Sequence, residues 1–182
     1  MKFLKLCIFG VLCIYQFQAS TKAQTVTPGI AVGENQSLVL TDKGTVYTFG
    51  EGTHGTLGQG NEGRFDIAAP ITHANLAGKK IIAAAVSKEL GGEDFTLLIA
   101  EDSTVYSFGE NSYGQLGHGD KISRRDPTQI THANITGKKF VAVSAGENFS
   151  VLLANDGSVF VMGFNNNGYL GIGSTSPTEI LA

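Results

Sequence analysis

The sequence contains no tryptophan and only two cysteines, and both of these, Cys7 and Cys13, lie near its start. If that segment is removed, no cysteine remains, which excludes a disulfide framework, a thiolate nucleophile and a cysteine metal site. Proline is scarce, with four residues, whereas glycine is abundant, with 24. This balance favours an ordered, turn-rich fold over a disordered chain.

Charge of either sign is also sparse. Charged residues make up 16% of the chain, and the net charge is −3 at pH 7. Nucleic-acid binding needs a concentrated basic face, so we expect no nucleic-acid partner. The longest apolar run, residues 6–15, is too short to span a bilayer comfortably.

That run has the layout of a secretory signal peptide. Lys2 and Lys5 flank it, and Thr21 and Ala23 place small residues at −3 and −1 of a cut before Gln24. The sequence therefore predicts a cleavable signal peptide over residues 1–23 and a secreted chain without membrane attachment after cleavage. An uncleaved signal anchor in the membrane is the alternative.

The rest of the chain contains three copies of a segment that align with one another without gaps. Residues 33–60, 92–119 and 146–173 align with one another, and each segment begins and ends with glycine. Successive copies start 59 and 54 residues apart, at positions 33, 92 and 146. A fixed period of this length indicates a solenoid, a propeller or an array.

Each copy begins with two short apolar runs around a turn. In the first copy, residues 37–40 and 45–49 flank a turn that contains Asp and Gly. β-Branched and aromatic residues on both sides of such a turn predict a β-hairpin. The middle copy has Ser103 where the others have glycine, so we expect its turn to be less favourable.

The second half of each copy is rich in glycine and contains one recurring leucine, at positions 57, 116 and 170. This pattern predicts a tight loop that the leucine pins into the core, with glycine where the backbone needs positive φ or close packing.

A second element repeats between the copies. Residues 71–81 match residues 130–140 and lead into a short apolar strand. The first unit carries five extra residues within 83–91, which we expect in a loop on one face. Each unit thus holds about four short strands, which predicts an all-β fold of propeller-type blades. We expect the domain over 24–182, with units at about 30–85, 86–142 and 143–182.

These residues resemble the regulator of chromosome condensation repeat family. The pattern is Gly-x-x-x-Ser, an apolar run, Asp-Gly, Val-Tyr-x-aromatic-Gly, and Asn-x-x-Gly-x-Leu-Gly-x-Gly, with residues 111–119 as the closest match. The resemblance covers about 30–182. The chain departs from it where the family usually has tryptophan, with Phe49, Phe108 and Met162 instead.

The resemblance implies a β-propeller of typically seven blades, of which this chain holds about three. Three interpretations remain open: a fragment of a longer propeller, a ring that copies of the chain close by homo-oligomerisation, or an open arc with exposed edges. The family includes a guanine-nucleotide exchange factor for the Ran GTPase that docks on chromatin, domains in ubiquitin ligases, and a secreted inhibitor of β-lactamases. A fold reused this widely does not fix a function.

We hypothesise a non-enzymatic, secreted module that binds a protein partner through loops on one face of the blades. The loops that differ between copies are the candidates, at 52–54, 83–91 and 121–125. Their candidate partner-binding residues are Thr53, His54, Lys88, Glu89, Lys121, Arg124 and Arg125. The alternatives are a nucleotide exchange factor for a Ran-like GTPase, against which the signal peptide argues, and a fragment without a separate role.

We expect no cofactor, no metal and no catalytic residue. Two Gly-x-G-x-x-Gly stretches, at 50–55 and 58–63, lack the following helix that dinucleotide binding needs. His73 and His132 occupy equivalent positions, so repetition explains them better than a metal site. Of three glycosylation sequons, the one at Asn134 is the best surface candidate.

Overall fold

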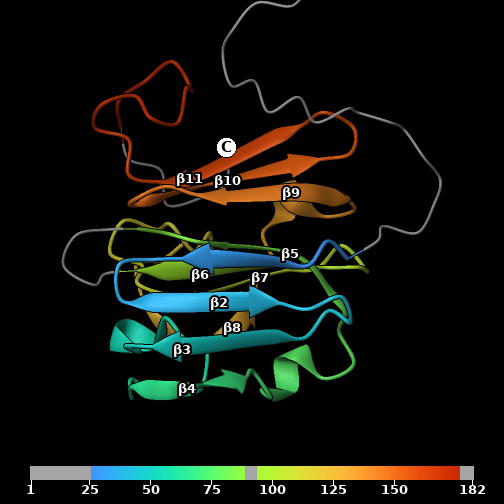
Figure 1. Ribbon diagram of the computed structural model, residues 1–182. Helices are drawn as coiled ribbons and strands as arrows, with labels where there is room; N and C mark the ends of the chain where they lie inside the picture. Colours follow the sequence, from blue (N-terminus) through green and yellow to red (C-terminus); the bar gives the residue numbers. More distant parts are fainter. Residues whose placement is uncertain (1–25, 89–93, 177–182) are drawn as a thin grey trace, which may run out of the picture.

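The computed structural model describes residues 26–88 and 94–176. The predicted signal peptide, Glu89 and residues 177–182 lie outside this part. Within it, the chain forms antiparallel sheets joined by turns and three short 3-10 helices, and contains no α-helix (Figure 1).

The strands divide into three sheets, in the spatial orders β1-β2-β3-β4, β5-β6-β7-β8 and β9-β10-β11. Figure 1 shows the third sheet at the top of the view and strands β2 to β4 at the bottom. The strand bounds are β1 Gly29–Val32, β2 Gln36–Leu40, β3 Val46–Gly50, β4 Phe65–Pro70, β5 Ile81–Val86, β6 Phe95–Ala100, β7 Val105–Gly109, β8 Arg124–Gln129, β9 Phe140–Ala145, β10 Phe149–Ala154 and β11 Val159–Gly163. The prediction of an all-β fold built from propeller-type blades is confirmed.

The predicted hairpins are β2–β3, β6–β7 and β10–β11, and all three pair antiparallel. At the equivalent turn position Gly44 and Gly157 have φ of 81° and 87°, and Ser103 has φ of 70°. A side chain in this left-handed region is strained. The less favourable turn expected of the middle copy is therefore confirmed.

The glycine-rich loops are also as predicted. Leu57, Leu116 and Leu170 are buried. A Cβ added at Gly58 would lie 2.7 Å from the Phe108 ring of the next sheet, so this glycine is needed for close approach as well as for its φ of 65°.

The hydrophobic core lies between the sheets. One cluster joins Leu38 and Leu40 of the first sheet to Tyr106 and Phe108 of the second. Another joins the opposite face of the second sheet to the third, for example Leu97 to Leu152. Because side chains alternate along a strand, the second sheet uses one face for each neighbour.

The sheets are offset from the sequence units. β5 pairs with β6, so the apolar strand that follows the first linker begins the second sheet. β9 pairs with β10 in the same way. Each linker therefore joins the last strand of one sheet to the first strand of the next. Linker 71–80 joins β4 to β5, and linker 130–139 joins β8 to β9.

Each linker contains a short 3-10 helix, η2 (Ala74–Leu76) or η3 (Ala133–Ile135). The Nδ1 atoms of His73 and His132 accept hydrogen bonds from the backbone of these helices, at 3.2 and 3.3 Å. This capping role gives the repeated histidines a structural function.

Candidate protein-interaction surface

The antiparallel topology sorts the connections onto two faces of the molecule. We call the loop face the one formed by residues 33–35, 51–64, 87–88, 94, 110–123, 146–148 and 164–176. The opposite face, which we call the connector face, carries the hairpin turns and the linkers 71–80 and 130–139. Of the candidate loop 83–91, residues 83–86 belong to β5 and so are not in a loop, Ser87 and Lys88 follow β5 on the loop face, and residues 89–91 lie outside the described residues.

Hydrogen bonds and ion pairs join neighbouring segments on each of these faces. On the loop face, the Glu34 backbone N–H donates to Asp94 at 3.0 Å. On the connector face, Lys79 pairs with Asp102, and Lys138 pairs with Asp156 at 2.8 Å. In both pairs a linker lysine meets the hairpin turn of the sheet that the linker enters.

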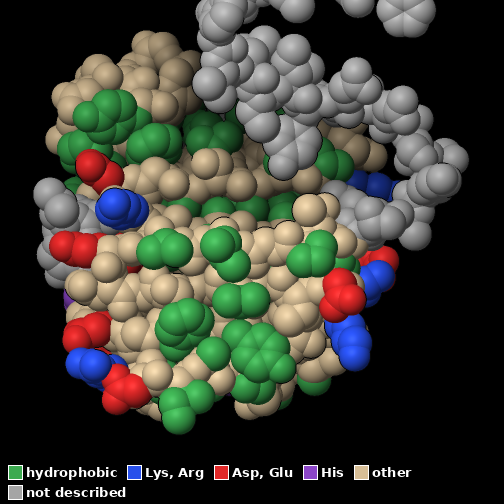
Figure 2. Space-filling view, viewed as in Figure 1, with side chains coloured by type: hydrophobic (Ala, Val, Ile, Leu, Met, Phe, Trp, Pro, Cys, Tyr) green, Lys and Arg blue, Asp and Glu red, His purple; other side chains and the backbone are tan. Residues whose placement is uncertain are grey.

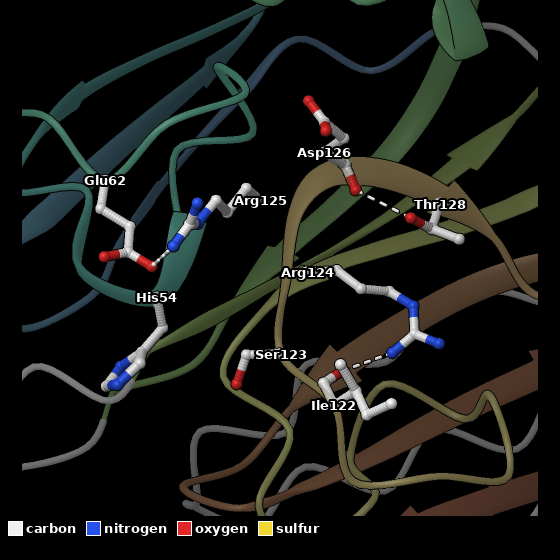
Figure 3. Close-up of a pocket in the computed structure, with 8 residues that line it drawn as sticks. All are labelled: His54, Glu62, Ile122, Ser123, Arg124, Arg125, Asp126 and Thr128. Atoms are coloured by element: carbon white, nitrogen blue, oxygen red, sulfur yellow. Dashed lines mark hydrogen bonds and ion pairs between the residues drawn. The ribbon is translucent and has the colours of Figure 1, made fainter.

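A groove opens on the loop face where the first two sheets meet (Figure 3). Its cavity has a volume of about 560 Å³. His54 and Glu62 lie on the side of the first sheet, and the second sheet contributes residues 122–126 and Thr128.

At the groove, the first sheet approaches β8 through a tight turn, η1 (Thr53–Gly55). Gly55 has φ of 83°, and a Cβ there would lie 2.3 Å from the Cα of Arg125. Any side chain at this position would push the turn away from β8. The glycine thus sets the distance between the two walls of the groove.

Both arginines of the groove are held by carboxylates. Arg125 pairs with Glu62 across the groove at 2.9 Å and is mostly exposed. Arg124 pairs with Asp120 of its own loop at 2.8 Å. The hydrogen bond from Arg124 lowers the pKa of Asp120 to about 2. The groove therefore presents positioned charges of both signs beside Ile122, whose side chain is 67% exposed.

His54 joins the groove to a buried carboxylate. Its Nδ1 lies 3.3 Å from Oε2 of Glu110, without the alignment of a hydrogen bond. Its own φ of 56° is unusual for a residue other than glycine. Burial alone would raise the pKa of Glu110, but hydrogen bonds from Ser112 and Ser123 and the nearby His54 outweigh it, so this pKa is lowered.

The structure brings four of the predicted residues together: Thr53, His54, Arg124 and Arg125 lie where η1 meets β8. Lys121 lies on the same face, in the loop before Ser123, and exposed Lys88 follows β5 there. Glu89 is outside the described residues. Asn134 is exposed on η3 of the connector face.

The candidate residues did not include Glu62, Glu110 or Ile122, although Ile122 lies within the candidate loop 121–125. Glu62 and Ile122 sit in loops whose sequences differ between copies, so the signal that selected Arg124 could also have found them. Glu110 is equivalent to Glu51 of the first copy. Glu110 is buried and Glu51 is exposed, and this difference depends on how the sheets pack.

Other titratable side chains have structural roles. Asp102 and Asp156 accept hydrogen bonds from the backbone two residues ahead, at 3.1 and 2.9 Å, so both side chains cap their turns. In residues 26–88 and 94–176, no group of three His, Asp or Glu side chains could hold a metal ion. No helix in this part of the chain is long and apolar enough to cross a bilayer.

Comparison with known proteins identifies the repeat. Residues 43–98 and 102–153 match the regulator of chromosome condensation (RCC1) repeat, and residues 140–168 match a second description of it. The chain belongs to the RCC1 repeat family. Its phenylalanine and methionine at the family's tryptophan position, Phe108 and Met162, are fully buried between sheets.

The relatives of this chain are much longer proteins. It is 33% identical to human HERC2, an E3 ubiquitin-protein ligase, over 147 residues, which are 81% of this chain and 3% of HERC2. Its fold matches human WBSCR16 with a TM-score of 0.72 at 24% identity, covering 91% of this chain and 39% of that one. It matches yeast RCC1 (Prp20), solved bound to Kap60, with a TM-score of 0.67 at 22% identity, covering 84% and 35%.

Proposed function

We propose that this chain is a secreted protein-binding module whose loop face contacts the partner, and that it acts by binding rather than by catalysis. The observation that carries this proposal is the convergence of the variable loops. Two of the segments that differ between copies, 52–54 and 121–125, open on one face and contribute to the two walls of one groove. A scaffold that stays constant while one face varies is typical of recognition.

The chemistry of the groove fits a protein surface. Ile122 offers an exposed apolar anchor, and Arg125 with Glu62 offers a charged rim. Interfaces of this kind combine a desolvated apolar centre with polar groups around it, and arginine is enriched in them.

The test compares two variants with the same change of charge. Ile122→Asp with Arg125→Glu alters the groove, and Thr136→Asp with Lys139→Glu alters exposed positions on the connector face. Proteins captured from the extracellular fluid of the source cells should be retained by the wild type and the connector-face variant and lost from the groove variant. Equal retention by both variants would contradict the proposal.

A second candidate is nucleotide exchange on a Ran-like GTPase, which the fold match favours. Prp20, the yeast relative, has been described for its binding to Gsp1p and histones. The expected signal peptide argues against this role, because a secreted chain would not meet such a GTPase. Accelerated nucleotide release from a Ran-like GTPase, lost in the groove variant, would establish exchange activity in place of extracellular binding.

A further inference from the structure

The first sheet has an apolar face that nothing in the described chain covers. It points away from the second sheet and carries Ile30, Val32, Val39, Tyr47 and Phe49. Strand register places Ile30 beside Val39, and Val39 beside Tyr47. Ile30 and Val32 are 79% and 63% exposed. Figure 2 shows hydrophobic side chains gathered over this sheet.

The repeat shows what this face is suited to contact. In the second sheet, Leu98, Tyr106 and Phe108 occupy the positions of Val39, Tyr47 and Phe49. Those three residues are fully buried in the cluster shared with the first sheet. The same pattern of side chains is therefore an inter-sheet interface in one copy and an exposed surface in the other.

The third sheet has the complementary exposed face. Val151, Leu153 and Val159 stand at the positions of Leu97, Ile99 and Val105, which are buried in the core between the second and third sheets. Val159 is 54% exposed. This face would meet a neighbour in the way that the second sheet meets the third.

The exposed face of the third sheet is also more apolar than the equivalent faces of the first and second sheets. In the first sheet Gln59 donates to Thr48 at 3.1 Å, and in the second His118 contacts Ser107 at 2.9 Å. The third sheet has Val161 and Ile172 at these positions. Two apolar side chains, one of them 40% exposed, thus replace a polar pair. Apolar side chains at these positions fit a face that packs against another protein surface.

A repeated hydrogen bond would set the register. Thr96 of the second sheet donates its hydroxyl to the Thr56 carbonyl of the first at 3.1 Å. Ser150 of the third donates to the Gln115 carbonyl of the second at 2.7 Å. Ser37 is the equivalent donor on the exposed face of the first sheet, and the Tyr169 carbonyl is the equivalent acceptor beside the third.

We propose that two copies of this chain associate head to tail, with the exposed face of the first sheet of one copy packed on the exposed face of the third sheet of the other. The occupant is a second copy because each chain carries both halves of an interface that it already makes twice internally. Such a contact is heterologous, since different surfaces of the two copies meet. It leaves the loop-face groove open, so it stands or falls separately from the proposed function.

Two single-face variants test the proposal by complementation. Ile30→Lys disables the face of the first sheet, and Val159→Lys disables that of the third; both positions are exposed, so the fold should tolerate lysine. The full chain, purified as cells deliver it, is measured by sedimentation velocity over a hundredfold range of concentration. The wild type should self-associate, each variant alone should be monomeric, and an equimolar mixture should form a heterodimer and nothing larger.

Several results would overturn this arrangement. A wild type that stays monomeric at every concentration refutes it, as does self-association that neither substitution weakens. If one substitution abolishes association and mixing does not restore it, the contact joins two identical faces instead. Circular dichroism shows whether each variant is folded, and Ser37→Lys with Ile172→Lys is a second pair if either of the first fails.

Discussion

Replacing His118 by glutamine should remove part of the acid sensitivity of the fold. Burial and the nearby Arg124 lower the pKa of His118 from 6.5 to about 4, although Asp120 opposes them. As the pH falls from 6.5 towards 4, His118 binds a proton in the unfolded chain but stays largely neutral in the folded chain. The free energy of unfolding therefore falls over this window, and the contribution of His118 is complete only above it.

Glutamine is the matched substitution because the first unit already uses it. Thr48 donates to the Leu57 carbonyl at 2.8 Å and accepts from Gln59. Ser107 likewise donates to the Leu116 carbonyl at 2.8 Å, so it accepts from Nε2–H of His118. His118→Gln should keep this hydrogen bond and lose only the titration.

The magnitude follows from the two pKa values. Between pH 7 and pH 5, the shift is worth at most about 2 kcal/mol of unfolding free energy. Because the imidazole is partly exposed, we expect about half of that, or about 1 kcal/mol. For a chain of this length, the wild type should lose about 2–4 °C more of its melting temperature than the variant between these pH values.

Thermal unfolding followed by circular dichroism at pH 7 and pH 5 provides the assay. At pH 7 the two proteins should differ by less than about 0.5 kcal/mol, since the hydrogen bond is retained. Equal losses by the wild type and His118→Gln on acidification would refute the reasoning, because His118 would then titrate alike in the folded and unfolded chains.

Three further predictions concern the hairpin turn, the loop core and the N-terminus. Ser103→Gly should raise the free energy of unfolding by about 1 kcal/mol in urea titrations, because Gly44 and Gly157 already occupy this left-handed position; a loss of stability would contradict the strain. Leu116→Ala should lower it by about 3 kcal/mol, measured in the same way, through the cavity left at a fully buried side chain. A loss below about 1 kcal/mol would show that the loop is not pinned by this leucine. Mass spectrometry of the exported protein should find Gln24 at its N-terminus, whereas an intact Met1 in the membrane fraction would indicate a signal anchor.

The sequence predicted the fold well because its determinants are local and repeated. Turn glycines such as Gly44, the alternating strands and the pinned loop leucines each follow from a few neighbouring residues. Three aligned copies made every pattern visible more than once. The same comparison located the variable loops of the candidate site, because a residue that departs from its copies is visible without a structure.

What could not be predicted depends on how the sheets pack. Burial of Glu110 and its approach to His54 involve two sheets and residues 56 positions apart, and no local pattern encodes them. The pairing of Arg125 with Glu62 likewise depends on the distance that Gly55 sets between η1 and β8. The capping role of His73 is local, but histidine is not among the residues preferred at a helix N-cap, so its repetition alone did not reveal this role.

The offset between sequence unit and sheet has a consequence for recombining these repeats. A junction at Gly92, where the sequence copy begins, would separate β5 from β6 and leave β5 without the strand that it pairs with. A junction within 71–80 or 130–139 would transfer each sheet whole, together with the lysine that pairs with its hairpin turn. The linkers are therefore the natural points for gaining, losing or exchanging units, in the laboratory and in the history of the gene.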